Sequence, residues 1–265
     1  MSDELPDGIC SVLVERLPNH IAVVTLNRPE VRNAINPAIT SELGHVVQAL
    51  DAAGDVWVIV LTGAGDKAFC AGADLTTVAS GQLDDLWTDD AGFAGFVFAK
   101  RTKPWIAAVN GAALAGGLEM ALACDMIVAD ERSTFGLPEV RVGLVAIAGG
   151  AFRLPRVIPP AIAFEMIATG QSIGAQRAFS LGLVNSVAPA GDSVTIALEL
   201  ATRIAGNAPI PVRESLAIAR RTSDLTESEL IRMSDEAWTR LSKTEDFAEG
   251  PRAFLEKRSP IWVGR

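Results

Sequence analysis

The 265-residue sequence contains no tyrosine, two histidines and three cysteines. The cysteines, Cys10, Cys70 and Cys124, are scattered and lack the spacing of a zinc site. Neither His20 nor His45 lies near a candidate nucleophile, and the chain has no Gly-x-Ser-x-Gly elbow. These shortages argue against a metal enzyme and a serine hydrolase. Scattered cysteines in odd number are typical of reduced thiols, so we expect a cytoplasmic protein without a bound metal.

Basic residues are also in short supply. The chain has 23 lysines and arginines against 32 acidic residues, which gives a net charge of −9 and a pI of about 4.8. The best basic run, Arg213, Arg220 and Arg221, is too small for a nucleic-acid-binding face. This balance disfavours nucleic acid and anionic membrane as partners, although a local group of cations could still bind a phosphorylated small molecule.

The sequence has no uninterrupted apolar run that reads as a membrane span. The most apolar stretch, residues 105–128, contains Asn110, Glu119 and Asp125, which a bilayer tolerates poorly, so we interpret it as buried core. The first thirty residues have no basic start followed by an apolar stretch, and we therefore expect no signal or transit peptide. They carry Asp3, Glu4, Asp7, Glu15 and Glu30.

What the chain does have is enough apolar sequence, 49% of its residues, to bury a large core. Short runs rich in valine and isoleucine alternate with helical patterns, which predicts an α/β domain whose strands are buried on both faces. The expected strands are residues 21–26, 56–61, 105–109 and 126–129, with a weaker one at 183–187. The expected helices are residues 37–52, 83–100, 117–123, 149–154, 162–168 and 175–181.

The pattern changes near residue 190, which divides the chain into a core of residues 1–190 and a helical region of residues 191–265. No strand signal follows the change, and Thr226 with Glu229 has the spacing of a capping box. Because this region is too thin to bury its own faces well, we expect it to pack on the core and on another subunit. Its four expected helices are residues 194–205, 212–221, 226–242 and 245–257.

Two glutamates lie in segments that are otherwise too apolar to accept a charge easily. Glu119 belongs to the segment 111–124, and Glu139 belongs to the segment 135–144. A carboxylate buried without a partner is costly, so it usually protonates, pairs or marks a site. Two such carboxylates near each other are what general acid–base chemistry on a neutral substrate needs, although burial in the core is an alternative interpretation.

Two loops of small residues follow expected strands. Residues 63–75 contain three glycines, and residues 110–119 connect a strand to a helix. Such loops let backbone N–H groups approach a ligand closely, and one donor from each would form an oxyanion hole. The alternatives are a flexible connection for the first loop and close packing of a helix on a sheet for the second.

Four motifs together resemble the signature of the enoyl-CoA hydratase/isomerase (crotonase) superfamily. They are Phe69-Cys-Ala-Gly-Ala-Asp-Leu75, the Gly-Gly-x-Glu of residues 116–119, Phe135-Gly-x-Pro-Glu139 and Gly143-Leu144. Residues 27–35 resemble the first-strand loop of that family, and the likeness covers essentially the whole chain. The resemblance implies a ClpP-like spiral of ββα units with a helical C-terminal trimerisation region. It also implies a homotrimer or a homohexamer that is a dimer of trimers.

The resemblance assigns roles to the central residues. Ala73 and Gly116 correspond to the oxyanion-hole positions, whose N–H groups bind the thioester oxygen. Glu119 and Glu139 correspond to the two catalytic glutamates of hydratases, with Glu119 activating water toward Cβ and Glu139 donating a proton to Cα. Family members with other activities often keep one of these carboxylates. The pair therefore favours an enoyl-CoA hydratase, which adds water reversibly and syn to a 2-trans-enoyl-CoA.

Other positions are implied for the acyl-CoA thioester substrate, which brings its own coenzyme A and needs no separate cofactor. The implied substrate and CoA positions are Arg32, Ala34, Ala71, Gly72, Asp74, Leu75, Gly117, Pro138, Gly143, Leu144, Ile147 and Phe254. Phe254 would reach the CoA site of a neighbouring subunit. Candidates for the CoA phosphates are Arg28, Arg32, Lys67, Lys257 and Arg258, although any of these charges could be ordinary solvated surface.

The stretch of residues 143–155 departs from the typical hydratase pattern. Ile147 replaces a glycine near the water site, Ala146 replaces a proline, and Phe152 replaces a glutamine. We expect the backbone N–H at Ile147 to persist and its branched side chain to narrow the pocket. Trp87, Phe93, Phe96 and Phe98 lie in a region that shapes the acyl pocket in the family, and simple core packing is expected for two of these four aromatic residues.

Three alternatives stay open within this interpretation. Residues 154–162, 165–170 and 244–265 resemble the carnitinyl-CoA dehydratase branch, although Ala73 differs from the bulkier residue of that branch. A Δ3,Δ2-enoyl-CoA isomerase would use one glutamate. A non-catalytic acyl-CoA-binding protein of the same fold would bind CoA tightly without turnover.

Overall fold

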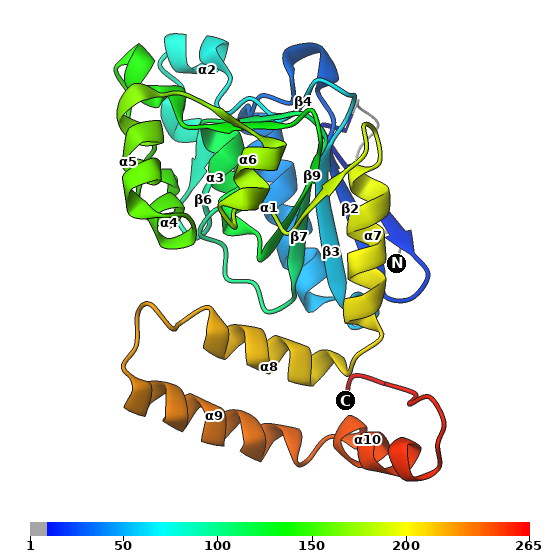
Figure 1. Ribbon diagram of the computed structural model, residues 1–265. Helices are drawn as coiled ribbons and strands as arrows, with labels where there is room; N and C mark the ends of the chain where they lie inside the picture. The colour runs from blue at the N-terminus through cyan, green and yellow to red at the C-terminus, as the bar shows by residue number, and fades with distance from the viewer. Residues whose placement is uncertain (1–9) are drawn as a thin grey trace.

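The computed structural model describes residues 10–265, and its core is built on two β-sheets of unequal size (Figure 1). The larger sheet has the strand order β1-β2-β3-β7-β9-β12, and the smaller sheet has the order β11-β10-β8-β4. The larger sheet consists of β1 (Val12–Leu17), β2 (Ile21–Leu26), β3 (Val58–Gly63), β7 (Trp105–Val109), β9 (Met126–Asp130) and β12 (Ser186–Ala188). The smaller sheet consists of β4 (Ala68–Cys70), β8 (Ala112–Leu114), β10 (Thr134–Gly136) and β11 (Ile173–Gly174).

Three successive units build both sheets together. β3, β7 and β9 are parallel neighbours in the larger sheet, and the short strand after each of them joins the smaller sheet in parallel. A helix follows each short strand: α2 (Leu75–Ala79), α3 (Gly116–Ala123) and the 3-10 helix η3 (Pro138–Val142). This repetition is the ββα spiral that the resemblance predicted. Because the short strands are parallel, the three strand-to-helix connections lie at the same edge of the smaller sheet.

Apolar residues on both sides of the larger sheet explain why its strands have no polar face. In β3, Val58 and Val60 pack in a cluster with α7 (Ser193–Ala205), whereas Ile59 and Leu61 belong to the main core, which includes α1 (Pro37–Ala52). α7 contributes alanines at every fourth position to its cluster, and such small side chains let a helix approach a sheet closely.

The structure confirms the main strands expected from the sequence. Residues 21–26 and 105–109 form β2 and β7 with the expected bounds, and residues 126–129 lie within β9. The strand expected at 56–61 begins and ends two residues later, as β3, and the weak signal at 183–187 yields only β12. The sequence did not reveal the short strands of the smaller sheet, because two or three residues are too few to show a periodic pattern.

The helix expected at residues 83–100 is wrong. The segment forms a 3-10 helix, η2 (Leu83–Leu86), and a small hairpin of β5 (Trp87–Thr88) and β6 (Gly92–Phe93), followed by turns. Gly92, Ala94 and Gly95 have φ values of 70°, 58° and 61°, which an α-helix excludes. Phe93 and Phe96 from this segment are buried in the core.

The remaining helices form where the sequence predicts them, with ends that differ by a few residues. The capping box of Thr226 and Glu229 is present at the start of α9. In the core these helices are α1, α3, α4 (Gly150–Val157), α5 (Pro160–Thr169) and α6 (Ala175–Ser180). In the C-terminal region they are α7, α8 (Pro209–Ala219), α9 (Glu227–Leu241) and α10 (Glu245–Leu255).

The C-terminal region divides into α7, which packs on the larger sheet, and α8 to α10, which lie beneath the core in Figure 1. Arg220, directly after α8, makes the joint between the two layers. Its Nε and Nη2 each donate to the Asp125 carboxylate at 2.7 Å, and its remaining contacts are the backbone oxygens of Arg101 and Lys103 at 2.8 and 3.0 Å. This ion pair is partly shielded from water, so it contributes more than an exposed surface pair would.

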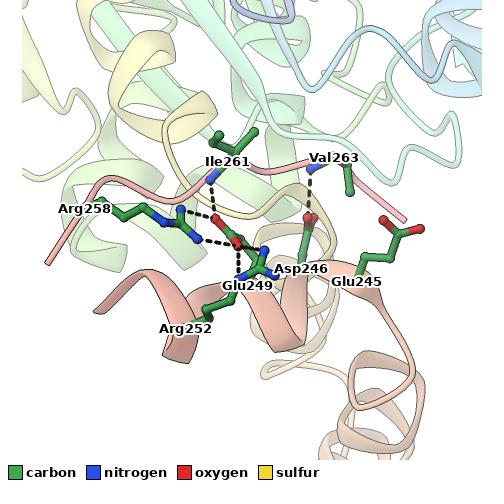
Figure 2. Close-up of a pocket in the computed structure, with 7 residues that line it drawn as sticks. All are labelled: Glu245, Asp246, Glu249, Arg252, Arg258, Ile261 and Val263. Carbon is green, nitrogen blue, oxygen red and sulfur yellow. Dashed lines mark hydrogen bonds and ion pairs between the residues drawn. The ribbon is translucent and has the colours of Figure 1, made fainter. Parts of the chain in front are cut away.

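The last residues of the chain fold back onto α10, as Figure 2 shows. Glu249 accepts hydrogen bonds from the Ile261 N–H at 2.8 Å and from Arg258 at 2.6 and 3.0 Å, and it also pairs with Arg252. Asp246 accepts hydrogen bonds from the N–H groups of Val263 and Gly264, which follow Ile261 closely in the C-terminal segment. Two carboxylates near the start of α10 therefore hold the C-terminal segment in place.

Within residues 10–265, no helix combines the length and the apolar character that crossing a bilayer requires. The expectation of no signal or transit peptide concerns, in part, residues 1–9, which lie outside the described residues.

The contacts of Glu249 predict pH-dependent stability. Hydrogen bonds from Arg258, the Ile261 N–H and Arg252 lower the pKa of Glu249 far below its ordinary value. The stabilisation is therefore complete above the unfolded-state pKa of about 4.3 and is lost as the pH falls below it. We expect Glu249→Gln to lower the melting temperature by a few degrees at pH 7, followed by circular dichroism, and by less at pH 3. Glu256→Gln, which alters only an exposed pair with Arg258, serves as the control. An equal melting temperature for Glu249→Gln and the native chain at pH 7 would contradict this account.

Candidate active site

A cavity of about 380 Å³ opens where the three strand-to-helix connections meet. Its walls come from the loop after β4, the 83–93 segment, the start of α3, and the stretch from η3 to the residues before α4. The lining residues are Ala71, Ala73, Leu75, Val78, Leu83, Trp87, Phe93, Ala115, Gly116, Glu119, Pro138, Glu139, Arg141, Val142, Leu144, Val145, Ile147 and Ala148. Residues from segments far apart in the sequence thus share one mainly apolar chamber.

Two backbone N–H groups border this cavity without an acceptor among residues 10–265. Ile35 pairs with the 72–74 backbone, donating to Gly72 O and accepting from Asp74 N–H, both at 2.8 Å, so the N–H of Ala73 faces the other way. Gly116 is the first residue of α3, where an N–H has no partner within the helix. The two loops touch, because a Cβ on Gly72 would lie 3.0 Å from Gly116 N.

The backbone turn that presents Gly116 is strained. Ala115 has φ 50° and ψ −128°, a conformation that costs a residue with a side chain on the order of 1–3 kcal/mol. The Ala115 N–H is held by Gly136 O at 3.0 Å, and its carbonyl accepts from Glu119 N–H at 3.1 Å. Gly116 itself has no room for a side chain, since a Cβ would lie 2.4 Å from the Phe93 ring.

Glu119 lies one turn into α3 with 3% of its surface exposed. Its Oε1 accepts a hydrogen bond of 2.8 Å from Gly150 N–H, at the start of α4. Burial raises the pKa of Glu119 to about 7, and the N–H of Gly150 opposes this effect while the charge of Glu139 adds to it. A carboxyl group with this pKa is present in both protonation states near neutral pH, as a general acid or base requires.

Glu139 faces the same cavity from η3, with 8% of its surface exposed. Neither of its carboxyl oxygens has a hydrogen-bond partner among the described residues. Burial raises the pKa of Glu139 above its ordinary value. An unpartnered buried carboxyl group is costly, so this group points to a ligand or a reaction that uses it.

The cavity brings together only part of the set expected from the sequence. Ala71, Ala73, Leu75, Gly116, Glu119, Pro138, Glu139, Leu144 and Ile147 line it. The other expected residues, Arg32, Ala34, Gly72, Asp74, Gly117, Gly143 and Phe254, do not. Gly72, Asp74, Gly117 and Gly143 are direct chain neighbours of lining residues, whereas Phe254 projects from α10 with 83% of its surface exposed.

Some expected interactions differ in the structure. The N–H of Ile147 persists as expected but is used within the loop, where it donates to Val145 O at 2.8 Å, and the side chain lines the cavity. Arg28, a candidate for CoA phosphate, instead joins two loops by donating to Ala34 O at 2.8 Å and to Asp74 at 3.0 Å.

Sequence reasoning missed two charged residues near the site. Arg141 lines the cavity, and Arg153 lies behind Glu119 on α4. The position of Arg141 in η3, two residues after Glu139, was a usable signal. No local pattern marks Arg153, because its neighbourhood depends on how α4 packs against α3.

The enoyl-CoA hydratase/isomerase family matches residues 16–265 of this chain. The chain belongs to this family. Carnitinyl-CoA dehydratase of Proteus mirabilis (strain HI4320) is 41% identical over 247 residues, which cover 91% of this chain and 94% of that protein. The protein of the same name from Escherichia coli (strain K12) is 40% identical over 250 residues, which cover 92% of this chain and 95% of that protein.

Solved structures give the same result for the fold. A crystal structure of enoyl-CoA hydratase from Mycobacterium tuberculosis H37Rv matches with a TM-score of 0.92 and 41% identity, covering 97% of this chain and 100% of that one. A crystal structure of carnitinyl-CoA hydratase from Mycobacterium avium matches with a TM-score of 0.76 and 43% identity, with the same coverage. The predicted crotonase fold and the likeness to the carnitinyl-CoA dehydratase branch are confirmed.

The position of α3 in this family member depends on Gly117. A Cβ at this residue would lie 2.0 Å from Cys70 O, a backbone atom of β4 that cannot move aside cheaply. We expect Gly117→Ala to lower the free energy of unfolding by at least about 1–3 kcal/mol, measured by urea denaturation. Gly54→Ala is the control, because a Cβ there would meet no atom within 4 Å. Equal stability of the two variants would show that α3 does not lie this close to β4.

Proposed function

We propose that this protein is an enoyl-CoA hydratase that adds water reversibly to a 2-trans-enoyl-CoA and gives a 3-hydroxyacyl-CoA. The observation that carries the proposal is the pairing of two buried carboxyl groups, Glu119 and Glu139, with two unused N–H groups around one apolar cavity. The amino-acid sequence supplies these groups in the order and spacing of the hydratases. The proposed reaction uses no cofactor other than the coenzyme A of the substrate.

The two N–H groups are suited to the thioester oxygen. When water adds to Cβ, negative charge moves to the carbonyl oxygen as an enolate forms. In this proposal the N–H groups of Ala73 and Gly116 donate to that oxygen. Loss of one such donor typically costs ~3 kcal/mol of transition-state stabilisation.

The carboxyl groups divide the proton transfers between them. Glu119, with a pKa of about 7, is ionised in part of the molecules at neutral pH and takes a proton from water as the oxygen attacks Cβ. Glu139, whose pKa is also raised, gives its proton to Cα. Each turnover therefore adds one water molecule, and the two carboxyl groups regain their starting protonation by exchange with water. The reverse sequence eliminates water.

The cavity walls favour a hydrocarbon acyl group. Most lining side chains are aliphatic or aromatic, and Trp87 and Phe93 meet edge to face with ring centroids 5.9 Å apart. Arg141 adds a positive charge at the wall, and its Nε is fixed by Thr169 O at 3.1 Å. Arg141 is exposed to solvent, which screens its charge, so this cation disfavours a trimethylammonium group, and with it a carnitinyl substrate, only to a modest degree. The names of the relatives favour carnitinyl-CoA dehydratase, which is therefore kept as the second candidate.

Assembly and location are further parts of the proposal. We expect a homotrimer or homohexamer, with the acyl-CoA thioester as the small-molecule partner. Apolar side chains on the outer helices support association: Ile231, Trp238, Phe254 and Leu255 are each more than half exposed. Phe254 would then reach the CoA of a neighbouring subunit. A cytoplasmic location stays a prediction from the cysteine content.

The proposal predicts that each glutamate is needed. We expect Glu119→Gln and Glu139→Gln each to reduce kcat for hydration of crotonyl-CoA by ~10²-fold or more, because each removes one proton transfer. Hydration is followed by the loss of the ultraviolet absorbance of the enoyl thioester. Glu165→Gln, on the exposed side of α5, is the matched control. Variants within a few-fold of the native enzyme would refute the assignment. Turnover of a 3-enoyl-CoA that survives Glu119→Gln would favour the isomerase, and CoA binding without any turnover would favour a non-catalytic binding protein.

The cavity also predicts a substrate preference. Each buried methylene contributes ~0.8 kcal/mol, so kcat/KM should rise about four-fold per added methylene until the cavity is filled. We expect 2-hexenoyl-CoA to be hydrated more efficiently than crotonyl-CoA, and crotonobetainyl-CoA to be the poorest of the three. If crotonobetainyl-CoA were the best substrate, the protein would be a carnitinyl-CoA dehydratase. Arg141→Met is a check on the cause, because it should improve crotonobetainyl-CoA selectively.

A further inference from the structure

Arg153 lies behind Glu119, on the side away from the candidate active site. It occupies the first turn of α4, three residues after Gly150, whose N–H binds Glu119 Oε1. Arg153 does not line the acyl cavity. It lines a separate cavity of about 640 Å³ between the core and α8. The α3–α4 packing therefore separates its guanidinium group from the proposed substrate.

The side chain of Arg153 is held firmly without a carboxylate partner. Its Nη2 donates to Val97 O at 2.6 Å, and its Nη1 lies 3.5 Å from Ala148 O. The rings of Phe98 and Phe152 are nearly parallel with centroids 6.5 Å apart, and the guanidinium carbon of Arg153 lies to one side of both, 5.4 and 5.6 Å from their centroids. In the described part of the chain, no ion pair joins Arg153 to an acidic residue.

Arg153 also shapes the loop that binds Glu119. A Cβ on Gly149 would lie 2.7 Å from Arg153 Nη1, so the backbone of Gly149 packs closely against the guanidinium. The backbone N–H of Arg153 donates a hydrogen bond of 2.8 Å to Gly149 O. The same short loop therefore contacts Arg153 with one side and the Glu119 carboxylate with the other.

We propose that Arg153 is a positioning residue for Glu119, which fixes the loop that binds this carboxylate and offsets its negative charge from the side away from the substrate. This inference rests on the proposed function, because it assumes that Glu119 is the base that activates water. Arg153 touches neither the substrate cavity nor the reacting atoms, so its effect passes through Glu119.

The charges around this pair have identifiable sources. Glu119 faces Glu139 from η3, which disfavours its ionised form, and Arg153 from α4, which favours it. The charged and titratable groups near Arg153 are Glu119 within α3, Cys124 directly after α3, and Arg156 on its own helix. Burial lowers the pKa of Arg153, and the carboxylate of Glu119 is the first of the groups that oppose this effect.

Two substitutions separate the charge of Arg153 from its packing. Arg153→Met keeps the apolar stem without charge, and Arg153→Gln keeps an amide that can donate to Val97 O. Both are expected to raise the pKa of Glu119, because each removes the cation that favours its ionised form. Arg153→Lys should keep Glu119 close to its native value. Arg156→Met, at an exposed cation of the same helix, should leave it unchanged.

The pKa of Glu119 can be measured without catalysis, from infrared difference spectra of its carboxyl group. Each Arg153 variant is combined with Glu139→Gln for this measurement, so that Glu119 is the one carboxyl group of the cavity. In the native background, the acid limb of kcat/KM for crotonyl-CoA should move to higher pH by the same amount. Near-ultraviolet circular dichroism checks the fold of each variant.

An unchanged Glu119 titration in whichever of the two neutral variants folds would overturn the inference. An equal shift of the Glu119 pKa in Arg156→Met would overturn it as well, because the shift would then follow from the loss of any nearby positive charge and not from Arg153 in particular. Neither result bears on the proposed function, which is tested separately by the hydration activity of the Glu119→Gln and Glu139→Gln variants.

Discussion

The close approach of α3 to the smaller sheet is the constraint on which the rest of the site depends. Gly117 lies so near Cys70 O that only hydrogen fits between them, and Gly116 likewise has no room for a side chain beside the Phe93 ring. This packing aims the start of the helix at the loop that contains Ala73. It also carries Glu119 into the apolar interior, one turn further on. A helix held farther away would separate the two N–H groups and leave the glutamate in water.

Burial at this position gives the site its chemical character. Water is largely excluded from both carboxyl groups, so their charged forms are disfavoured and their pKa values rise. The two groups are not equivalent, because Glu119 has a hydrogen bond from Gly150 and a cation behind it, whereas Glu139 has no partner among the described residues. This asymmetry is what divides a pair of similar side chains into a base and an acid.

The C-terminal layer is attached by charged groups rather than by a large apolar core. Arg220 joins α8 to the end of α3 through Asp125, and the tail is fastened to α10 by Asp246 and Glu249. These contacts leave the apolar side chains of α9 and α10 facing outward. The same helix α3 thus contributes to the site with its first residues and meets the joint with the C-terminal layer just beyond its last.

The sequence by itself determined the family, the main strands and helices, and the two glutamates, because each of these leaves a local mark in apolar periodicity, glycine content or motif order. It failed at residues 83–100, where close packing imposes positive φ values on Gly92, Ala94 and Gly95 against a helical pattern. It also could not show that Ile147 N–H is already bonded or that Arg153 lies behind Glu119. Only the tertiary structure decided these features, because they depend on which distant segments come into contact. Hydrogen-bond partners and burial determine the free energy of a charged group more strongly than its neighbours in the sequence do.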